Sequence, residues 1–253
     1  MSLNLKAKMN NYPNTKIHNT LPKILRYRSV SMPDTVALRD KDLGIWNEIT
    51  WKQYNNNVSY LALALSKRGF KKGDVIGLIG DNKPSWLYFE LAAQAVGGMS
   101  LGIYRDTLDE EVGYLINAAK VNFVYAEDQE QVDKILTIKR PKNSQITMFY
   151  EDSRGLKELN DPHIVDMLKL MNEGQDIANK SPNKYDQMID KISTEQEAIL
   201  CTTSGTTSNP KLAMLPGGKF VEHVLRYLNV DPKTDTDEYV SVLPFPWIME
   251  QIY

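Results

Sequence analysis

Residues 201–215 read Cys201-Thr-Thr-Ser-Gly-Thr-Thr-Ser-Asn-Pro-Lys-Leu-Ala-Met-Leu215, and the rest of the sequence is interpreted outward from them. Hydroxyl side chains surround a single glycine that permits a tight bend, and the N–H groups of such a bend can hold an anion. Lys211 adds a positive charge suited to phosphate. The stretch therefore predicts a phosphate-binding loop, made by Thr203, Ser204, Gly205, Thr206, Thr207, Ser208 and Lys211.

Apolar runs flank this loop, from Ala198 to Cys201 and from Leu212 to Leu215, so it is expected to connect two strands. An ordinary surface loop uses the same residue types, and composition alone leaves that alternative open. A Walker A loop is excluded, because Pro210 precedes the lysine and the residues after it are apolar rather than helix-capping.

Before the loop, short apolar runs alternate with amphipathic segments. Strands are expected at 34–39, 75–79, 100–104, 121–126 and 146–150, with a hairpin at 41–51. Helices are expected at 21–28, 50–69, 86–96, 108–119, 129–137 and 164–171, and a polar linker or exposed loop at 173–183. After the loop, a helix is expected at 218–228 and a strand at 239–243. Strands that are apolar throughout and alternate with helices predict an α/β fold with a parallel sheet covered on both faces.

Several residues predict where these helices begin and end. Thr50 and Thr107 are expected as N-caps, and Pro84 suits a first helical turn. Gly69 and Gly97 are expected to end the helices that precede them.

Composition narrows the class of protein. The 253 residues are 42% apolar and 25% charged, as in globular proteins. The net charge of -2 gives no reason to expect a nucleic acid as partner. The single cysteine excludes an internal disulfide and fits a reducing cytoplasm, and no signal segment opens the chain. Peripheral membrane contact and oligomeric state stay open.

The histidines, the cysteine and one acidic cluster are interpreted as structural or surface residues, not as catalytic or metal-binding ones. His18, His163 and His223 lack metal-ligand spacing. Cys201 follows an apolar run and is interpreted as a core residue rather than a nucleophile. The acidic cluster of Glu127, Asp128, Glu130 and Asp133 is interpreted as a solvated helix start.

Residues 202–211 align without gaps to the signature (Y/F)-T-S-G-T-T-G-x-P-K-G, so the chain resembles acyl-adenylate-forming enzymes. Further segments resemble long-chain fatty acyl-CoA synthetases in particular: 43–51, 77–86, 92–98, 126–133 and 243–251. The resemblance implies layered βα sheets flanked by helices, forming the N-terminal half of the large domain of such an enzyme. The expected divisions are an irregular segment at 1–20, the first part of the AMP-binding domain at 21–190, and the loop with the start of an acyl-side subdomain at 191–253.

The resemblance also implies a two-step reaction. A long-chain fatty acid carboxylate attacks the α-phosphate of ATP to give acyl-AMP, and coenzyme A then displaces AMP. Residues 203–208 would cradle the phosphates, Thr203 would also ligate Mg²⁺, and Lys211 would supply charge. Trp247 and Glu250 are the expected acyl-side residues. The alternative for these two is a buried tryptophan and an exposed or capping glutamate.

Ser208 and Leu212 stand where the family has glycine. The family's adenine-recognition segment, metal-binding glutamate, ribose-binding aspartate and C-terminal lysine would all lie beyond residue 253. The natural protein is therefore expected to continue, and this chain alone is expected not to form acyl-CoA. An adenylating enzyme for another carboxylate, or a non-catalytic nucleotide-binding or structural fragment, are the alternatives.

Overall fold

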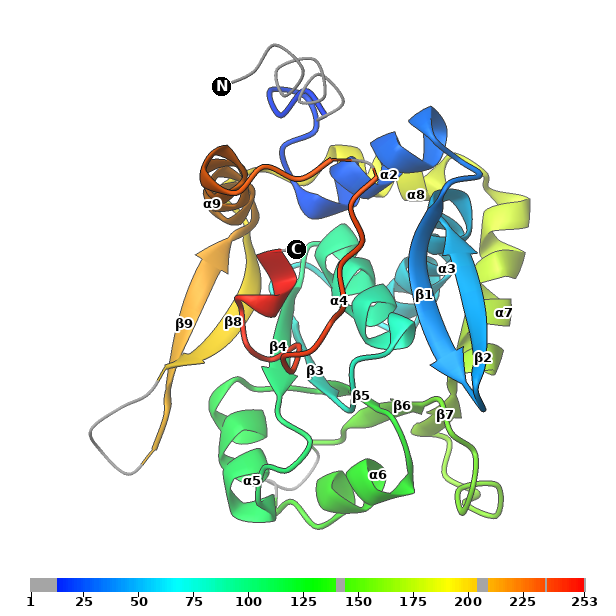
Figure 1. Ribbon diagram of the computed structural model, residues 1–253. Helices are drawn as coiled ribbons and strands as arrows, with labels where there is room; N and C mark the ends of the chain where they lie inside the picture. The colour runs from blue at the N-terminus through cyan, green and yellow to red at the C-terminus, as the bar shows by residue number, and fades with distance from the viewer. Residues whose placement is uncertain (1–12, 140–143, 204–208, 235, 253) are drawn as a thin grey trace.

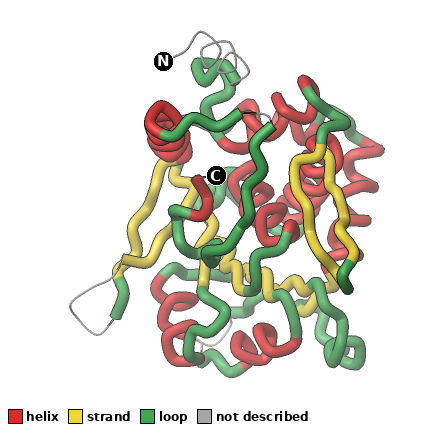
Figure 2. Tube along the Cα trace, viewed as in Figure 1, coloured by secondary structure: helices red, strands yellow, loops and turns green. Residues whose placement is uncertain are grey.

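The computed structural model describes residues 13–139, 144–203, 209–234 and 236–252, which fold into one seven-stranded sheet, a separate hairpin and surrounding helices (Figures 1 and 2). The strands are β1 (Val36–Asp42), β2 (Ile45–Thr50), β3 (Val75–Ile79), β4 (Met99–Ile103), β5 (Phe123–Ala126), β6 (Thr147–Tyr150), β7 (Ile164–Asp166), β8 (Glu197–Thr203) and β9 (Lys211–Pro216). The helices are α2 (Leu21–Ser31), α3 (Trp51–Lys67), α4 (Pro84–Val96), α5 (Asp109–Ala118), α6 (Gln129–Leu136), α7 (Met167–Lys180), α8 (Lys184–Asp190), α9 (Gly217–Val230) and the 3₁₀ turn η2 (Glu250–Ile252).

The sheet has the strand order β7-β6-β5-β3-β4-β8-β9. Neighbouring strands are parallel from β7 to β8, and β9 is antiparallel to β8. The chain passes from β3 to β4 on one side and then returns to β5 on the other side of β3. A crevice at the carboxyl ends of the strands, where the winding reverses, is the usual ligand site of such sheets.

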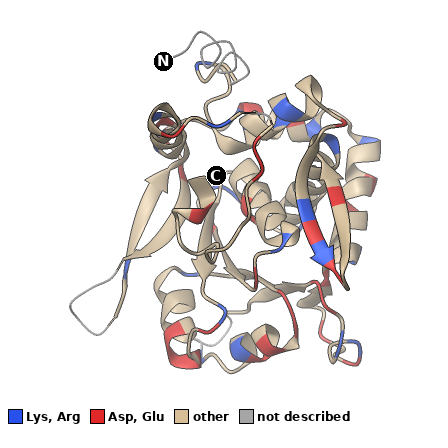
Figure 3. Ribbon diagram, in the orientation of Figure 1, with Lys and Arg blue, Asp and Glu red and all other residues tan. Residues whose placement is uncertain are grey.

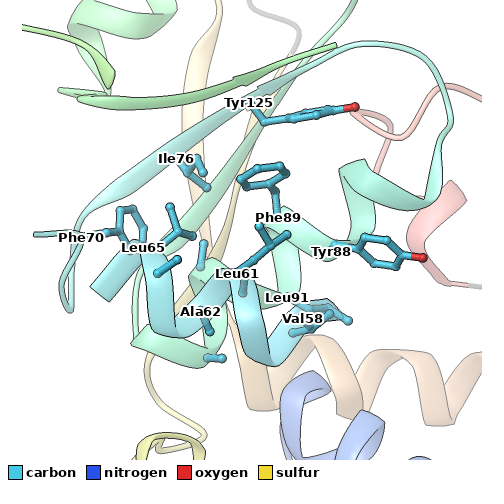
Figure 4. Close-up of a cluster of buried hydrophobic side chains, with 14 of the residues drawn as sticks. Val58, Leu61, Ala62, Leu65, Phe70, Ile76, Tyr88, Phe89, Leu91 and Tyr125 are labelled. Atoms are coloured by element: carbon cyan, nitrogen blue, oxygen red, sulfur yellow. The ribbon is translucent and has the colours of Figure 1, made fainter. Parts of the chain in front are cut away.

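Helices cover both faces of the sheet, as predicted. On one face, α2, α3, α4, α7 and α8 enclose a core in which Phe89 stacks on Tyr125 with ring centroids 4.8 Å apart (Figure 4). On the other face, α5 and α6 bury Val112, Ile116 and Val132 against the opposite side of the strands. A third cluster joins β8, α9 and the end of the chain.

Most predicted helix ends are confirmed. Thr50 caps α3 through a reciprocal capping box with Gln53, Pro84 occupies the first turn of α4, and Gly97 ends α4 in the left-handed region. The prediction of Thr107 as the cap of α5 is wrong by one residue. Leu108 occupies the cap position without a side-chain hydrogen bond, and acidic residues fill the first turn instead.

Two predictions between residues 164 and 183 are wrong. The expected helix at 164–171 is a short strand, β7, followed by α7, because the Asp166 side chain accepts hydrogen bonds from Leu168 N and Lys169 N and starts the helix there. The expected linker at 173–183 is largely the second half of α7, which packs on α3. An added Cβ at Gly174 would lie 1.8 Å from the carbonyl oxygen of Tyr60, so the two helices approach closely there.

The strand predicted at 239–243 is also wrong. This segment has no regular secondary structure, and the side chains of Asn82 and Glu250 bond its backbone in place of a neighbouring strand. In Figure 1 the orange-to-red chain after α9 crosses α4 and ends beside β4.

None of the described helices is long and apolar enough to cross a membrane. Both signs of charge are interspersed over the molecule in the view of Figure 3.

Candidate functional site

The two ends of the predicted phosphate-binding loop meet at the carboxyl end of β8. Thr203, the last residue of β8, pairs with Lys211, the first residue of β9, and the Thr203 hydroxyl donates to the Lys211 carbonyl oxygen at 3.3 Å. Both residues are exposed. The prediction that the loop connects two strands is confirmed by these flanking strands. Ser204, Gly205, Thr206, Thr207 and Ser208 lie outside the described residues.

The exit of the loop is attached to α5. The Tyr114 hydroxyl donates a hydrogen bond of 3.1 Å to the carbonyl oxygen of Pro210, the residue before Lys211. Leu212, on the other side of Lys211, packs half-buried against the core beneath α5 and α6. These contacts hold the backbone on both sides of Lys211 and give Leu212 a packing role.

An ion-pair cluster occupies the carboxyl ends of β3, β4 and β5. Arg105, just after β4, contacts Asp81 after β3 and Asp128 after β5. Glu127 is only 6% exposed; it accepts a hydrogen bond of 2.6 Å from the Asp81 N–H and pairs with Lys83 at 3.4 Å. The interpretation of this acidic cluster as a solvated helix start is therefore wrong for Glu127, because the strand ends and the loop after β3 enclose it.

A second buried acid, Glu90, is a residue of α4. Ser100 of β4 donates to Glu90 Oε1 at 2.7 Å. Burial raises the pKa of Glu90 to about 7, against the opposing effect of that hydrogen bond. Burial, with the nearby Glu90 carboxylate as a second cause, raises the pKa of the Cys201 thiol to about 11. Cys201 is therefore a protonated thiol near neutral pH, which fits its interpretation as a core residue and not as a nucleophile.

The two expected acyl-side residues lie in opposite environments. Trp247 is 47% exposed, whereas Glu250 is 3% exposed. Glu250 Oε2 accepts hydrogen bonds from the Tyr239 hydroxyl at 2.8 Å and the Leu243 N–H at 3.1 Å, and Glu250 Oε1 has no partner among the described residues. The alternative was a buried tryptophan and an exposed or capping glutamate; in the structure the tryptophan is exposed and the glutamate is buried.

The segment that carries these two residues lies against the loop between β3 and α4. Phe245 packs on Trp86 of α4, with ring centroids 5.1 Å apart, and Asn82 hydrogen bonds the backbone of Leu243 and Phe245. Two stretches that share a family resemblance, 77–86 and 243–251, are thus in contact although more than 150 residues separate them.

The sequence did not single out Asn82, Tyr114, Glu90 or the burial of Glu127. Asn82 lies inside segment 77–86, which carries part of the family resemblance, but the sequence does not show that it contacts residues 241–245. Nothing local in the sequence marks Tyr114, because its partner lies 96 residues away. Among the described residues, no group of three or more His, Cys, Asp or Glu residues could hold a metal ion.

The family model for AMP-binding enzymes matches residues 25–253. The chain belongs to this family, and the sequence prediction of the family is confirmed.

Three similar curated proteins are named long-chain-fatty-acid–CoA ligases. The chain is 28% identical over 240 residues to the rat long-chain-fatty-acid–CoA ligase ACSBG2, covering 92% of this chain and 35% of that protein. It is 30% identical over 183 residues to the Xenopus laevis ACSBG2 ligase, covering 72% and 24%, and 28% identical over 227 residues to human ACSBG1, covering 87% and 30%. The chain therefore spans about a third or less of the length of these relatives.

Solved structures share the fold. The luciferase-like enzyme from the mealworm Zophobas morio matches with a TM-score of 0.74 at 14% identity, covering 95% of this chain and 52% of that one. VinN matches with a TM-score of 0.71 at 15% identity, covering 93% and 54%. The predicted α/β class, with a mainly parallel sheet between helices, is confirmed.

Proposed function

We propose that this chain forms the N-terminal part of an AMP-forming ligase that converts a long-chain fatty acid to acyl-AMP and then to acyl-CoA. The observation that carries the proposal is the pairing of Thr203 with Lys211 at the mouth of the signature loop, at the carboxyl edge of the sheet. The names of the curated relatives support the substrate class.

Charge develops on the β- and γ-phosphates as pyrophosphate leaves, and preorganised donors and cations stabilise it. Lys211 supplies the cation, and the contacts of Tyr114 and Leu212 hold its backbone in place. Residues 203–208 are proposed to supply hydroxyl and N–H donors. This loop positions phosphates and transfers no proton.

Among the loop residues that the structure describes, Thr203 offers an oxygen ligand for Mg²⁺. Thr203 Oγ1 uses its proton toward the Lys211 carbonyl, so its lone pairs remain available for a hard cation. Bound Mg²⁺ would neutralise phosphate charge, with phosphate and water oxygens as its other ligands.

On the acyl side, Trp247 offers a rigid apolar surface of the kind that contacts a hydrocarbon chain. Glu250 is proposed to act through the shape of its segment, because its Oε2 already bonds Tyr239 and Leu243.

The test uses the complete protein with ATP, Mg²⁺ and a panel of acids. ATP–pyrophosphate exchange is measured with palmitate, acetate, benzoate and the standard amino acids, and thioester formation is measured after adding coenzyme A. Exchange and palmitoyl-CoA formation with palmitate support the proposal. Exchange with amino acids or benzoate but not with palmitate would reassign the substrate, and no exchange with any acid would favour a non-catalytic role.

A further inference from the structure

Asn82, in the loop between β3 and α4, uses its whole amide group to hold the segment near the end of the chain. Its Nδ2 donates to Ser241 Oγ at 2.6 Å and to the Leu243 carbonyl oxygen at 2.7 Å. Its Oδ1 accepts from the Phe245 N–H at 3.1 Å. An amide side chain has two N–H donors and one carbonyl, so each of these groups is engaged with the same segment.

Packing places the same segment directly on the sheet. Phe245 is 8% exposed, and its ring centroid is 5.1 Å from that of Trp86. Pro246 lies over Gly102 of β4, where an added Cβ would come within 2.8 Å of the Pro246 Cα. The glycine thus lets the segment approach the strand backbone more closely than any other residue would allow.

The loop that presents Asn82 is itself held on both sides. The Asp81 N–H donates to Glu127 Oε2, and Lys83 pairs with Glu127 Oε1 at 3.4 Å. Arg105 contacts Asp81 as well. Asn82 is therefore presented from a loop fixed to the ends of β4 and β5.

The backbone of Leu243 and Phe245 also forms hydrogen bonds with side chains of the 3₁₀ turn η2. The Leu243 N–H donates to Glu250, while the Leu243 carbonyl accepts from Asn82. The Phe245 N–H donates to Asn82, while the Phe245 carbonyl accepts from Gln251 Nε2 at 2.8 Å. Side chains from both sides thus satisfy the polar backbone groups that a neighbouring strand would otherwise bond.

We infer that Asn82 is a positioning residue that sets the place of residues 243–251, and through them Trp247, relative to α4 and β4. Its effect on catalysis rests on the proposed function, in which this segment faces the acyl chain. The hydrogen bonds of Asn82 go to residues 241–245 and not to Thr203 or Lys211, the described ends of the phosphate-binding loop. We therefore expect Asn82 to affect the use of the fatty acid and not the binding of ATP.

The experiment uses the complete protein and its Asn82→Ala, Asn82→Asp and Gln251→Ala variants, with the exposed Asn47→Ala as control. Steady-state kinetics gives the KM for palmitate and the KM for ATP, and hydrogen–deuterium exchange follows residues 239–252. Loss of three hydrogen bonds should raise the palmitate KM roughly tenfold or more and speed exchange of the segment. The ATP KM should change less than about twofold.

Asn82→Asp keeps the acceptor but loses both donors, so it should behave like Asn82→Ala. Gln251→Ala removes the bond to Phe245 without altering the loop after β3, and should shift both readouts in the same direction. This variant keeps the test decisive if Asn82→Ala does not fold.

The outcomes separate the inference from the proposed function. Faster hydrogen–deuterium exchange of residues 239–252 in a protein that makes no palmitoyl-CoA supports the positioning role of Asn82 and rejects the ligase assignment. An unchanged palmitate KM in an active ligase overturns the inference, as does an equal rise in both KM values.

Discussion

Lys211 is the residue whose charge the proposed chemistry needs most directly. Its backbone is held by β9 pairing and by the neighbouring contacts of Pro210 and Leu212, so removal of its side chain should leave the fold intact. In the complete protein, Lys211→Ala should slow ATP-dependent adenylation by roughly 100-fold, in line with the loss of one preorganised electrostatic group. Transfer from preformed acyl-AMP to coenzyme A should change much less.

The two half-reactions are measured separately, by ATP–pyrophosphate exchange and by thioester formation from synthetic acyl-AMP. Lys219→Ala, which removes an exposed lysine of α9, is the matched control. An equal loss in both half-reactions would assign Lys211 to the fold instead of the phosphates.

Glu90 gives a pH dependence with a defined sign. Because burial raises its pKa from 4.5 in the unfolded chain to about 7, the folded chain binds more protons between those two pH values. The free energy of unfolding therefore falls as the pH rises through this window, by about 3 kcal/mol for this group. Glu90→Gln should remove that part of the slope.

Urea unfolding of this chain and its Glu90→Gln variant from pH 5 to pH 8 measures the difference. The exposed Glu158→Gln is the control and should follow the wild type at every pH. A Glu90→Gln variant with the wild-type slope would show that Glu90 is not protonated in the folded chain.

At the scale of the element, the packing of α7 on α3 depends on one glycine. An added Cβ at Gly174 would meet the Tyr60 carbonyl oxygen at 1.8 Å, and this atom is backbone that cannot rotate away. Gly174→Ala should therefore lower the free energy of unfolding by about 2–3 kcal/mol, as overpacked core sites do.

Gly113 in α5 offers the opposite case in the same chain. The nearest neighbour of an added Cβ there is Ile138, at 3.8 Å, which is ordinary contact. Gly113→Ala should stabilise the chain by about 0.5–1 kcal/mol, because alanine favours helix over glycine. Urea unfolding measures both variants. A Gly174→Ala variant as stable as the wild type would contradict the close approach of α3 and α7.

The sequence predicts elements well where local signals agree. Val75–Ile79 is apolar throughout and is a fully buried strand, and Pro84 and Gly97 bound a helix whose residues favour that state. It fails at 173–183 because the second half of α7 is stabilised by contact with α3, which local composition does not reveal. It fails at 239–243 because an apolar run alone cannot show whether a neighbouring strand exists to pair with it.

In the candidate site too, residues with a local sequence signal were predicted and residues that depend on distant contacts were not. Thr203 and Lys211 were predicted from the motif, and the structure pairs them across two strands. Tyr114 and Asn82 were missed because each acts on a segment far away in the sequence. Such contacts depend on the order of the strands in the sheet. Local patterns in a single sequence do not reveal that order, so the partners of Tyr114 and Asn82 could not be predicted.

At the scale of the whole molecule, several apolar side chains of the described residues face solvent. The apolar residues Val240 and Val242 are 76% and 74% exposed, and Met214 on the edge strand β9 is 59% exposed. We propose that these residues belong to a surface that another part of the complete protein covers. Curated relatives about three times as long would have the chain length to supply that covering part.

The 253-residue chain by itself is therefore expected to form no palmitoyl-CoA. In the proposed function, Lys211 and the signature loop bind phosphates from one side, and binding from one side does not exclude water or orient a carboxylate toward the α-phosphate. Thioester formation with ATP, Mg²⁺, palmitate and coenzyme A is compared between this chain, the complete protein and the complete Lys211→Ala variant. The isolated chain should fall at or below the variant. Turnover by the isolated chain that Lys211→Ala abolishes would show that the 253 residues already contain a complete catalytic site.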